Sequence, residues 1–247
     1  MLYLIGLGLD KKDISFSSIE KIKKCKKIYL ESYTISFPYP VKDLEKFLST
    51  AAKKKIKLII SDRELMENNI KKIIREAKYE DIAILIYGDP LAATTHASII
   101  EEAKQDKIKY ELLHAPSIFT GISNTGLQLY KFGKTTSIPK WQDNFKPMSF
   151  FNIILENQAI KAHTLILSDI GLKLEDALRE LAQAAIANDK DILGETIFIC
   201  SKLGTRNEKI TRTKISQLIK DKKLQAQIKE PFCFVYPGEM HFFELKE

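Results

Sequence analysis

The sequence has few cysteines, few arginines and no long apolar run, and each shortage argues against a class of protein. Its three cysteines, Cys25, Cys200 and Cys233, are odd in number and lack C-x-x-C spacing, which disfavours a disulfide framework or a zinc ribbon. The four histidines are dispersed, so we expect no metal site. The longest apolar runs, such as 82–87, fall far short of the ~18 residues that cross a bilayer, and we predict no membrane-spanning helix.

Arginine is scarce although the chain is basic. Lysine and arginine number 39 against 32 acidic residues, a formal charge of +7, but only five of the 39 are arginine. Because arginine supplies the bidentate contacts to phosphate and guanine, this balance disfavours nucleic acid as a partner. A solvated lysine surface explains the excess charge, and a preference for acidic partners, including an acidic protein substrate, is the alternative.

The amino-terminal segment MLYLIGLGLD also lacks the features of a signal peptide. It has no basic region, reaches an acidic residue at Asp10 and shows no small-residue cleavage site. It predicts a buried strand, and we expect the protein in the cytoplasm. With 247 residues, 45% of them hydrophobic, the chain is long enough for a globular protein of one or two domains.

Strand and helix patterns alternate through residues 1–113. The fourth strand pattern, IAILIY, is apolar on both faces, which is typical of a parallel sheet covered by helices on both sides. We therefore predict a first α/β domain over 1–113 with a mostly parallel sheet. Its strands are expected at 2–9, 28–33, 56–60, 81–87 and 109–113, with helices at 17–27, 41–53, 63–77 and 94–105.

Pro116 interrupts this alternation, and a second α/β domain is predicted over 114–247. Its strands are short, and a return hairpin near Gly204 favours a mixed sheet over a purely parallel one. Strands are expected near 135–139, 164–168, 196–203, 209–213 and 231–236, and helices at 117–126, 147–160, 174–187 and from 214.

The first glycine turn is ambiguous as a ligand site. Gly6 and Gly8 begin a G-x-G pattern but no third glycine follows, and no G-x-x-x-x-G-K-[ST] loop exists, so neither phosphate-binding fingerprint is complete. The two glycines either let a ligand approach the main chain or form an ordinary tight turn. No G-x-S-x-G elbow accompanies the serines, which leaves a hydrolase triad unsupported.

The loop after the most buried strand is a stronger candidate. Residues 88–96, GDPLAATTH, leave the carboxyl end of that strand, where open α/β sheets bind ligands, and offer the carboxylate of Asp89 and the small Ala92. Alternatively, Asp89 closes a turn and a threonine caps the next helix. Ser117 follows Pro116 at the domain change, and His241 follows a Pro-Gly turn, where a plain surface histidine is equally compatible.

Together these segments resemble the diphthine synthase family, S-adenosylmethionine-dependent methyltransferases of diphthamide formation on translation elongation factor 2. The combination of GDP, ATTH and then HAPSI some twenty residues later is specific. The resemblance is carried by YLIGLGL (3–9), GDPLAATTH (88–96), HAPSI (114–118), GLQLYKFGK (126–134), HTLILSDI (163–170) and PGEMHFFE (237–244).

The resemblance implies a fold of two α/β domains that hold S-adenosylmethionine in the cleft between them. Tetrapyrrole methylases usually continue the first glycine turn with Pro-Gly-Asp, whereas this chain has Leu9-Asp10-Lys11, which favours the diphthine branch. Carried over by motif position, the cofactor contacts are Leu9, Asp89, Ala92, Ser117, Ile118, Ser168, Leu203 and His241.

The implied reaction is N-methylation. The amino group of a 3-carboxypropyl-modified histidine on the elongation factor attacks the sulfonium methyl, and successive transfers give a trimethylammonium product, diphthine. The residues nominate no catalytic base. The family further suggests a homodimer with the elongation factor as protein partner. The alternatives are a methyltransferase for a corrin precursor and, from another class, a non-enzymatic protein that binds RNA or anions.

Overall fold

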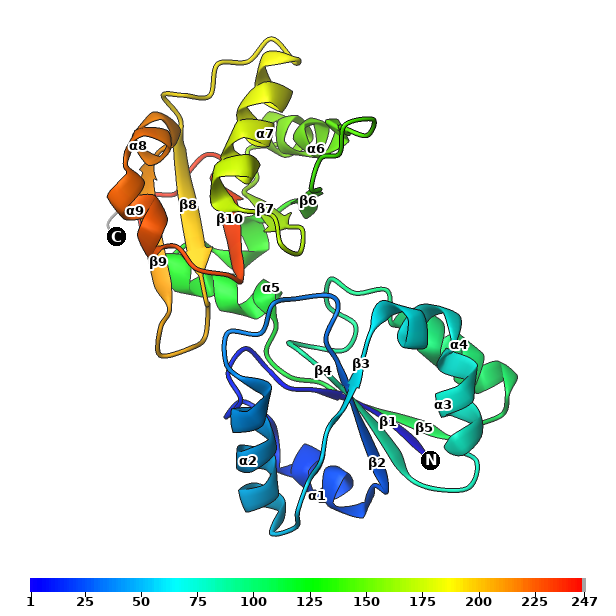
Figure 1. The fold of residues 1–247 in the computed structure, drawn as a ribbon. Helices are drawn as coiled ribbons and strands as arrows, with labels where there is room; N and C mark the ends of the chain where they lie inside the picture. The colour runs from blue at the N-terminus through cyan, green and yellow to red at the C-terminus, as the bar shows by residue number, and fades with distance from the viewer. Residues whose placement is uncertain (246–247) are drawn as a thin grey trace. The chain divides into compact units, whose positions relative to one another are not determined.

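The computed structural model describes residues 1–245. Internal contacts divide the chain into two compact units, Met1–Gly121 and Ile122–Glu247, and each unit is built around its own five-stranded sheet (Figure 1). The sequence places the domain boundary after residue 113, where the last strand of the first sheet ends.

The first sheet is parallel throughout, with the strand order β3-β2-β4-β1-β5. Helices α1 and α2 contribute to the apolar cluster on one face, and α3 and α4 to the cluster on the other. The elements are β1 Leu2–Gly6, α1 Phe16–Lys24, β2 Lys27–Glu31, α2 Val41–Ala52, β3 Ile59–Ser61, the π-helical turn η1 Glu64–Asn68, α3 Ile70–Glu76, β4 Ile82–Ile86, α4 Ala97–Gln105, β5 Tyr110–Leu113 and α5 Ile118–Gly121.

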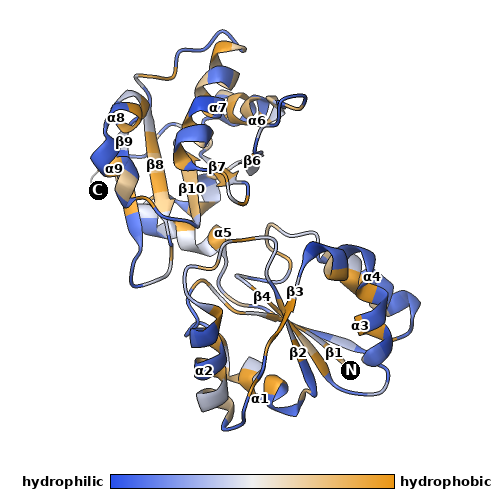
Figure 2. Cartoon of the chain, in the orientation of Figure 1, coloured by the Kyte–Doolittle hydropathy of each residue, from blue (hydrophilic) through white to orange (hydrophobic). Residues whose placement is uncertain are grey.

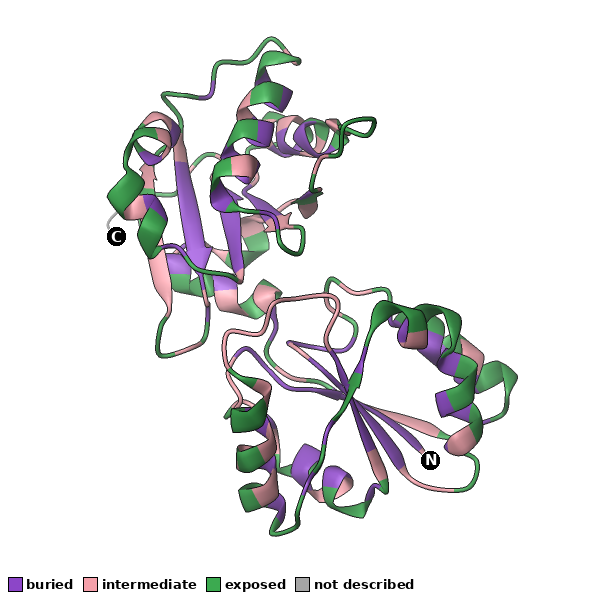
Figure 3. Ribbon diagram, viewed as in Figure 1, coloured by how far each residue is buried: buried purple, intermediate pink, exposed green. Residues whose placement is uncertain are grey.

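Burial explains why the central strands of this unit have no polar face. All five residues of β1 and of β4 are buried, because helices cover both sides of the sheet (Figure 3). The helices show the complementary pattern, with apolar residues toward the sheet and polar residues outward (Figure 2). The predicted parallel sheet covered on both faces is confirmed.

Several predicted elements of the first unit are too long at one end. The third strand begins at Ile59 and not at Ile56, because side chains of α2 take up the preceding main-chain groups. Ser49 Oγ accepts the N–H of Ile56 at 3.0 Å, and Glu45 Oε1 accepts that of Leu58 at 2.8 Å. The first helix, predicted over 17–27, is capped by Ser15 and ends at Lys24, because β2 already begins at Lys27.

The second sheet is mixed, as predicted, in the order β6-β7-β10-β8-β9. Only the β6–β7 pair is parallel among the pairs in this sheet of the described chain. Its elements, with the short helices that precede it, are η2 Ile122–Thr125, η3 Leu129–Lys131, β6 Thr136–Ile138, α6 Ser149–Ala159, β7 Thr164–Ser168, α7 Leu174–Ile186, β8 Thr196–Ser201, β9 Lys209–Lys214, α8 Ile215–Lys220, α9 Lys222–Gln227 and β10 Phe232–Tyr236.

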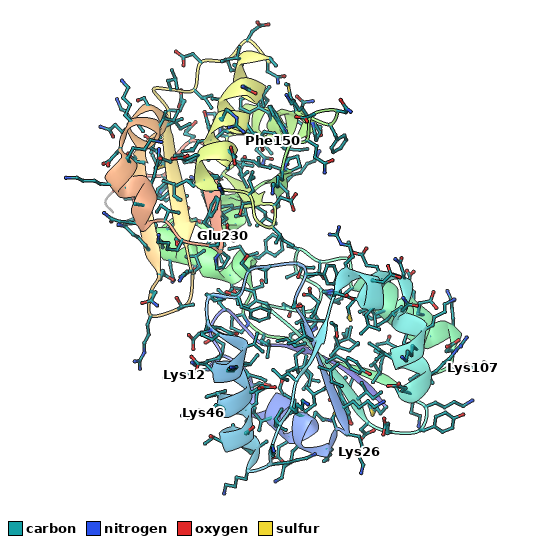
Figure 4. The ribbon with its side chains drawn as sticks, in the orientation of Figure 1. Lys12, Lys26, Lys46, Lys107, Phe150 and Glu230 are labelled. Atoms are coloured by element: carbon teal, nitrogen blue, oxygen red, sulfur yellow. The ribbon has the colours of Figure 1, made fainter. Side chains whose placement is uncertain are left out.

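One apolar cluster forms the core of this second unit. It joins α6, α7 and α8 to strands β7, β8 and β10, and Phe150 of α6, labelled in Figure 4, lies within it. Over residues 1–245 no helix combines the length and the apolar character that crossing a membrane requires.

Candidate functional site

The site proposed from the sequence begins where three neighbouring strands of the first sheet end. Strands β4, β1 and β5 are adjacent and parallel, so the loops that follow them emerge at the same edge. Gly8 and Gly88 join two of these loops through reciprocal main-chain hydrogen bonds of 3.1 and 3.0 Å. A Cβ built on Gly88 would lie 3.7 Å from Ser117 Cα, which places the third loop beside them.

Asp89 links the β4 loop to the β5 loop. Its buried carboxylate accepts the N–H of Leu91 at 2.9 Å within its own loop. Across the gap it accepts the N–H of Ala115 at 3.2 Å, and its Oδ2 lies 2.7 Å from Nδ1 of His114. The carboxylate therefore closes a turn and also fixes a second loop.

Leu9 contributes a buried side chain and a main chain that is already paired. Its N–H donates to Asp13 Oδ2 at 3.0 Å, and its carbonyl accepts the Tyr87 hydroxyl at 2.9 Å. Burial raises the pKa of that phenol, with a smaller contribution from the nearby Asp13 and Asp10 carboxylates, so it remains a donor. The hydrogen bonds with Asp13 and Tyr87 therefore hold the β1 loop in one conformation.

The rest of the β4 loop, residues 91–95, is exposed or half-buried. Ala92 donates its N–H to the Asp89 carbonyl at 3.2 Å, and Ala93 adopts a left-handed conformation with φ of 56°. Non-glycine residues in this region are uncommon and concentrate at turns and functional sites. Ser117 Oγ accepts the N–H of Phe119 at 3.3 Å where α5 begins with Ile118.

The glycine turn leads to a testable prediction about how these loops pack. A Cβ on Gly6 would lie 2.7 Å from the Gly88 carbonyl oxygen and 2.8 Å from Ala115 Cβ, so Gly6 serves loop packing. We expect Gly6→Ala to cost roughly 1–3 kcal/mol of folding free energy through overpacking. Urea unfolding measures it, with Gly194→Ala, where a Cβ meets nothing within 4 Å, as the control. Equal stability of the two variants would contradict the packing role.

In the second unit, Ser168 and Leu203 lie toward one end of the mixed sheet. Ser168 ends β7 and donates its hydroxyl to the Phe232 carbonyl at 2.6 Å, where β10 begins. Leu203 is buried and follows β8, which pairs with the same end of β10 through Phe232 and Ser201. These two predicted residues are therefore on neighbouring loops.

His241 lies at the opposite end of that sheet, because it follows the carboxyl end of the antiparallel strand β10. Its main-chain N–H donates to Glu244 Oε2 at 2.6 Å, and its ring packs against that of Phe242 at a tilt of 42°, with centroids 4.2 Å apart. Within the second unit, the structure does not bring His241 beside Ser168 and Leu203.

Glu244 holds the segment that carries His241. Its buried carboxylate accepts the N–H groups of Gln128 and His241, the ammonium of Lys131 and Nε2–H of His163. Burial acts to raise the pKa of Glu244, but these hydrogen bonds outweigh it and lower the pKa to about 2. His163 Nδ1 accepts the Gly238 N–H, which leaves Nε2 as its donor.

Two further polar side chains lie at the carboxyl edge of the first sheet and were not predicted from the sequence. His114 directly follows β5, and Glu31, which ends β2, is fully buried and accepts the N–H groups of Tyr33 and Thr34 at 2.6 and 2.8 Å. Their position at strand ends is the signal that could have found them. Among residues 1–245 no cluster of three or more His, Cys, Asp or Glu side chains is arranged to hold a metal ion.

The fold and these loops match one family. The chain belongs to the tetrapyrrole (corrin/porphyrin) methylase family, whose model matches residues 1–219. Within it, diphthine methyl ester synthase of Schizosaccharomyces pombe is 41% identical over 184 residues, which are 74% of this chain and 62% of that protein. The match thus spans less than two thirds of the relative's length.

Solved structures agree with this relationship over nearly the whole chain. A crystal structure of diphthine synthase superposes with a TM-score of 0.86 at 27% identity, covering 99% of this chain and 93% of the other. A putative diphthine synthase from Entamoeba histolytica gives 0.85 at 29% identity, covering 99% and 95%. The family predicted from the sequence is confirmed.

Proposed function

We propose that this chain is an S-adenosylmethionine-dependent methyltransferase of diphthamide biosynthesis. Its substrate is the 3-carboxypropyl-modified histidine of translation elongation factor 2, whose amino group takes up the methyl groups. The observation that carries the proposal is the joining of the β1, β4 and β5 loops at one sheet edge, since these loops bear the GLGL, GDP and HAPSI motifs. Similarity to diphthine synthases over both units supports it.

The chemistry of these loops fits the cofactor. S-adenosylmethionine carries hydroxyl and ammonium donors, and the loops carry side-chain acceptors in the Asp89 carboxylate and the Ser117 hydroxyl. Ala92 and Ala93 have no side chain beyond Cβ, which leaves the main chain of the β4 loop accessible to a ligand. When bound, the cofactor supplies an electrophilic methyl group on sulfur, while the protein aligns the nucleophile and excludes water.

The name of the relative, diphthine methyl ester synthase, points to a second group that could accept a methyl group. A methyl ester synthase methylates a carboxylate, whereas our sequence-based prediction ends at the N-methylated amine. Both acceptors belong to the same modified histidine, and we propose that one site serves them in turn. Mass spectrometry of the modified elongation factor distinguishes the outcomes, because complete N-methylation adds three methyl groups and the ester adds one more.

Calorimetry with S-adenosylhomocysteine tests the class of activity without the protein substrate. We expect saturable binding and a rise in the midpoint of thermal unfolding, because a ligand that binds the folded state stabilises it. Methyl transfer to a corrin precursor instead of the elongation factor would favour the tetrapyrrole alternative. Absence of binding, together with strongly salt-dependent RNA binding, would favour the non-enzymatic one.

The distribution of charge supports a protein substrate over nucleic acid. Four exposed lysines are labelled on the first unit in Figure 4 and project from more than one side: Lys12 and Lys46 from one side, Lys26 from the lower end and Lys107 from the opposite side. Nucleic-acid binding proteins usually gather such charge on one face. We further propose that the protein is a cytoplasmic homodimer. Light scattering would measure the mass of the particle in solution and so test the dimer.

A further inference from the structure

We infer that His114, oriented by Asp89, accepts the proton that the substrate amine must lose before each methyl transfer. The inference rests on the proposed function, because it assigns a role within amine methylation. Asp89 and His114 form a side-chain pair that joins the β4 loop to the β5 loop. Asp89 also joins these loops through the Ala115 N–H, so the connection between them does not by itself require a histidine.

The exposure of the two side chains differs sharply. The Asp89 side chain is 12% exposed and the His114 side chain 65% exposed, with Oδ2 and Nδ1 2.7 Å apart. An ionised carboxylate only accepts hydrogen bonds, so Nδ1 of His114 is the donor. The neutral ring then carries its lone pair on Nε2, and the exposure of the side chain makes it accessible to a substrate.

Asp89 is itself fixed, which makes it suitable as an orienting group. The N–H groups of Leu91 and Ala115 donate to its two oxygens, at 2.9 and 3.2 Å. A base whose second nitrogen is held by a buried carboxylate has a defined tautomer and ring orientation, as in catalytic triads.

The other histidines of the described chain are not placed for this role. His96 and His163 are buried. Both ring nitrogens of His163 are engaged, one by the Gly238 N–H and one by Glu244. The Glu244 carboxylate accepts the main-chain N–H of His241, while ring Nδ1 accepts the Phe243 N–H at 3.5 Å, so a main-chain group and not a carboxylate contacts that ring nitrogen.

The substrate ammonium loses one N–H proton to His114 Nε2, and the electron pair left on nitrogen forms the new N–C bond. The C–S bond breaks, and its electrons remain on sulfur as a neutral thioether. The imidazolium then releases its proton to water, which the exposed position of the His114 side chain allows. A carboxylate acceptor has no proton to lose, so ester formation does not need His114.

The experiment compares His114→Gln with the wild type in single turnover, using elongation factor 2 that carries the 3-carboxypropyl-modified histidine. We expect N-methyl transfer to fall about 100-fold, the lower part of the range for general-base catalysis. With the trimethylated factor as a second substrate, the ratio of ester formation to N-methylation should rise by a similar factor. Added imidazole should restore part of the activity of His114→Ala, because the exposed position leaves room for it.

The outcomes separate the inference from the proposed function. If the wild type transfers no methyl group to the factor, the proposed function is wrong, and the role of His114 that depends on it is wrong as well. If the wild type is active and His114→Gln retains its N-methylation rate, only the inference is overturned. A parallel fall of N-methyl and ester transfer without imidazole rescue would show a merely structural histidine and would also overturn it.

Nitrogen NMR of the protein alone gives a readout without substrate. At a pH where the ring is neutral, we expect His114 as the Nδ1–H tautomer in the wild type. In Asp89→Asn the preference should weaken, because the amide no longer offers a charged acceptor. An Nε2–H tautomer in the wild type would overturn the orientation on which the inference depends.

Discussion

Asp89→Ala is expected to weaken both S-adenosylhomocysteine binding and the folding of the first unit. The substitution removes the acceptor for two main-chain N–H groups, those of Leu91 and Ala115, and for the ring of His114. Leaving such donors unpaired should cost roughly 2–4 kcal/mol of folding free energy. Affinity for S-adenosylhomocysteine should fall by roughly 10-fold or more as the loop loses its shape.

Two controls separate the role of Asp89 in folding from its role in binding. Asp10→Ala removes another carboxylate at the same edge of the sheet. The Asp10 carboxylate accepts one exposed main-chain N–H, that of Lys12, so the effect of this substitution on stability should be small. Asp89→Asn keeps the size of the side chain and an oxygen acceptor, and should lie between alanine and wild type. Urea unfolding and calorimetry measure the two effects. Full stability and full affinity in Asp89→Ala would exclude it from the site.

Glu244→Ala should be the most destabilising change in the second unit. The side chain is fully buried, and its removal leaves the buried His163 and the ammonium of Lys131 without their shared acceptor. Breaking one side of a buried charged pair costs roughly 3–5 kcal/mol. Glu239→Ala is the matched control, since that carboxylate is exposed and pairs with Lys161 at the surface, and it should change stability little.

The same carboxylate makes stability depend on pH in acid. The hydrogen bonds that overcome the cost of burial hold the pKa of Glu244 at about 2 in the folded protein, against an ordinary value of 4.5. Its contribution, roughly 3 kcal/mol, is therefore fully present above the ordinary value and is lost as the pH falls toward 2. Urea unfolding at a series of acidic pH values should show this loss in the wild type and a shallower slope in Glu244→Gln. Parallel pH profiles for the two proteins would contradict it.

The fold was predictable where the apolar pattern decides it. The run IAILIY could only be a strand buried on both faces, and β4 lies at the centre of the first sheet. The errors arise where one side chain replaces a main-chain partner. Ser49 and Glu45 reach from α2 to the N–H groups of Ile56 and Leu58, a competition that the local sequence pattern does not reveal.

The candidate site was predictable in part for a similar reason. Asp89 was identified because ligands bind at the carboxyl ends of parallel strands, but its partner His114 is 25 residues away and was not. In the second unit, the order of the motifs along the chain does not indicate in which direction each strand runs. Because β10 is antiparallel to β7, Ser168 and His241 follow neighbouring strands yet leave the sheet at opposite ends. Only the pairing of the strands reveals that separation.

The position of β1 in its sheet has a consequence for synthesis of the chain. Strand β1 lies between β4 and β5, so the strands that pair with it begin 80 and 108 residues later in the chain, at Ile82 and Tyr110. Until then an apolar segment remains without its neighbours, and contacts between such distant segments form slowly. The nascent chain should therefore need protection of this strand by a chaperone for longer than one whose first two strands form a hairpin.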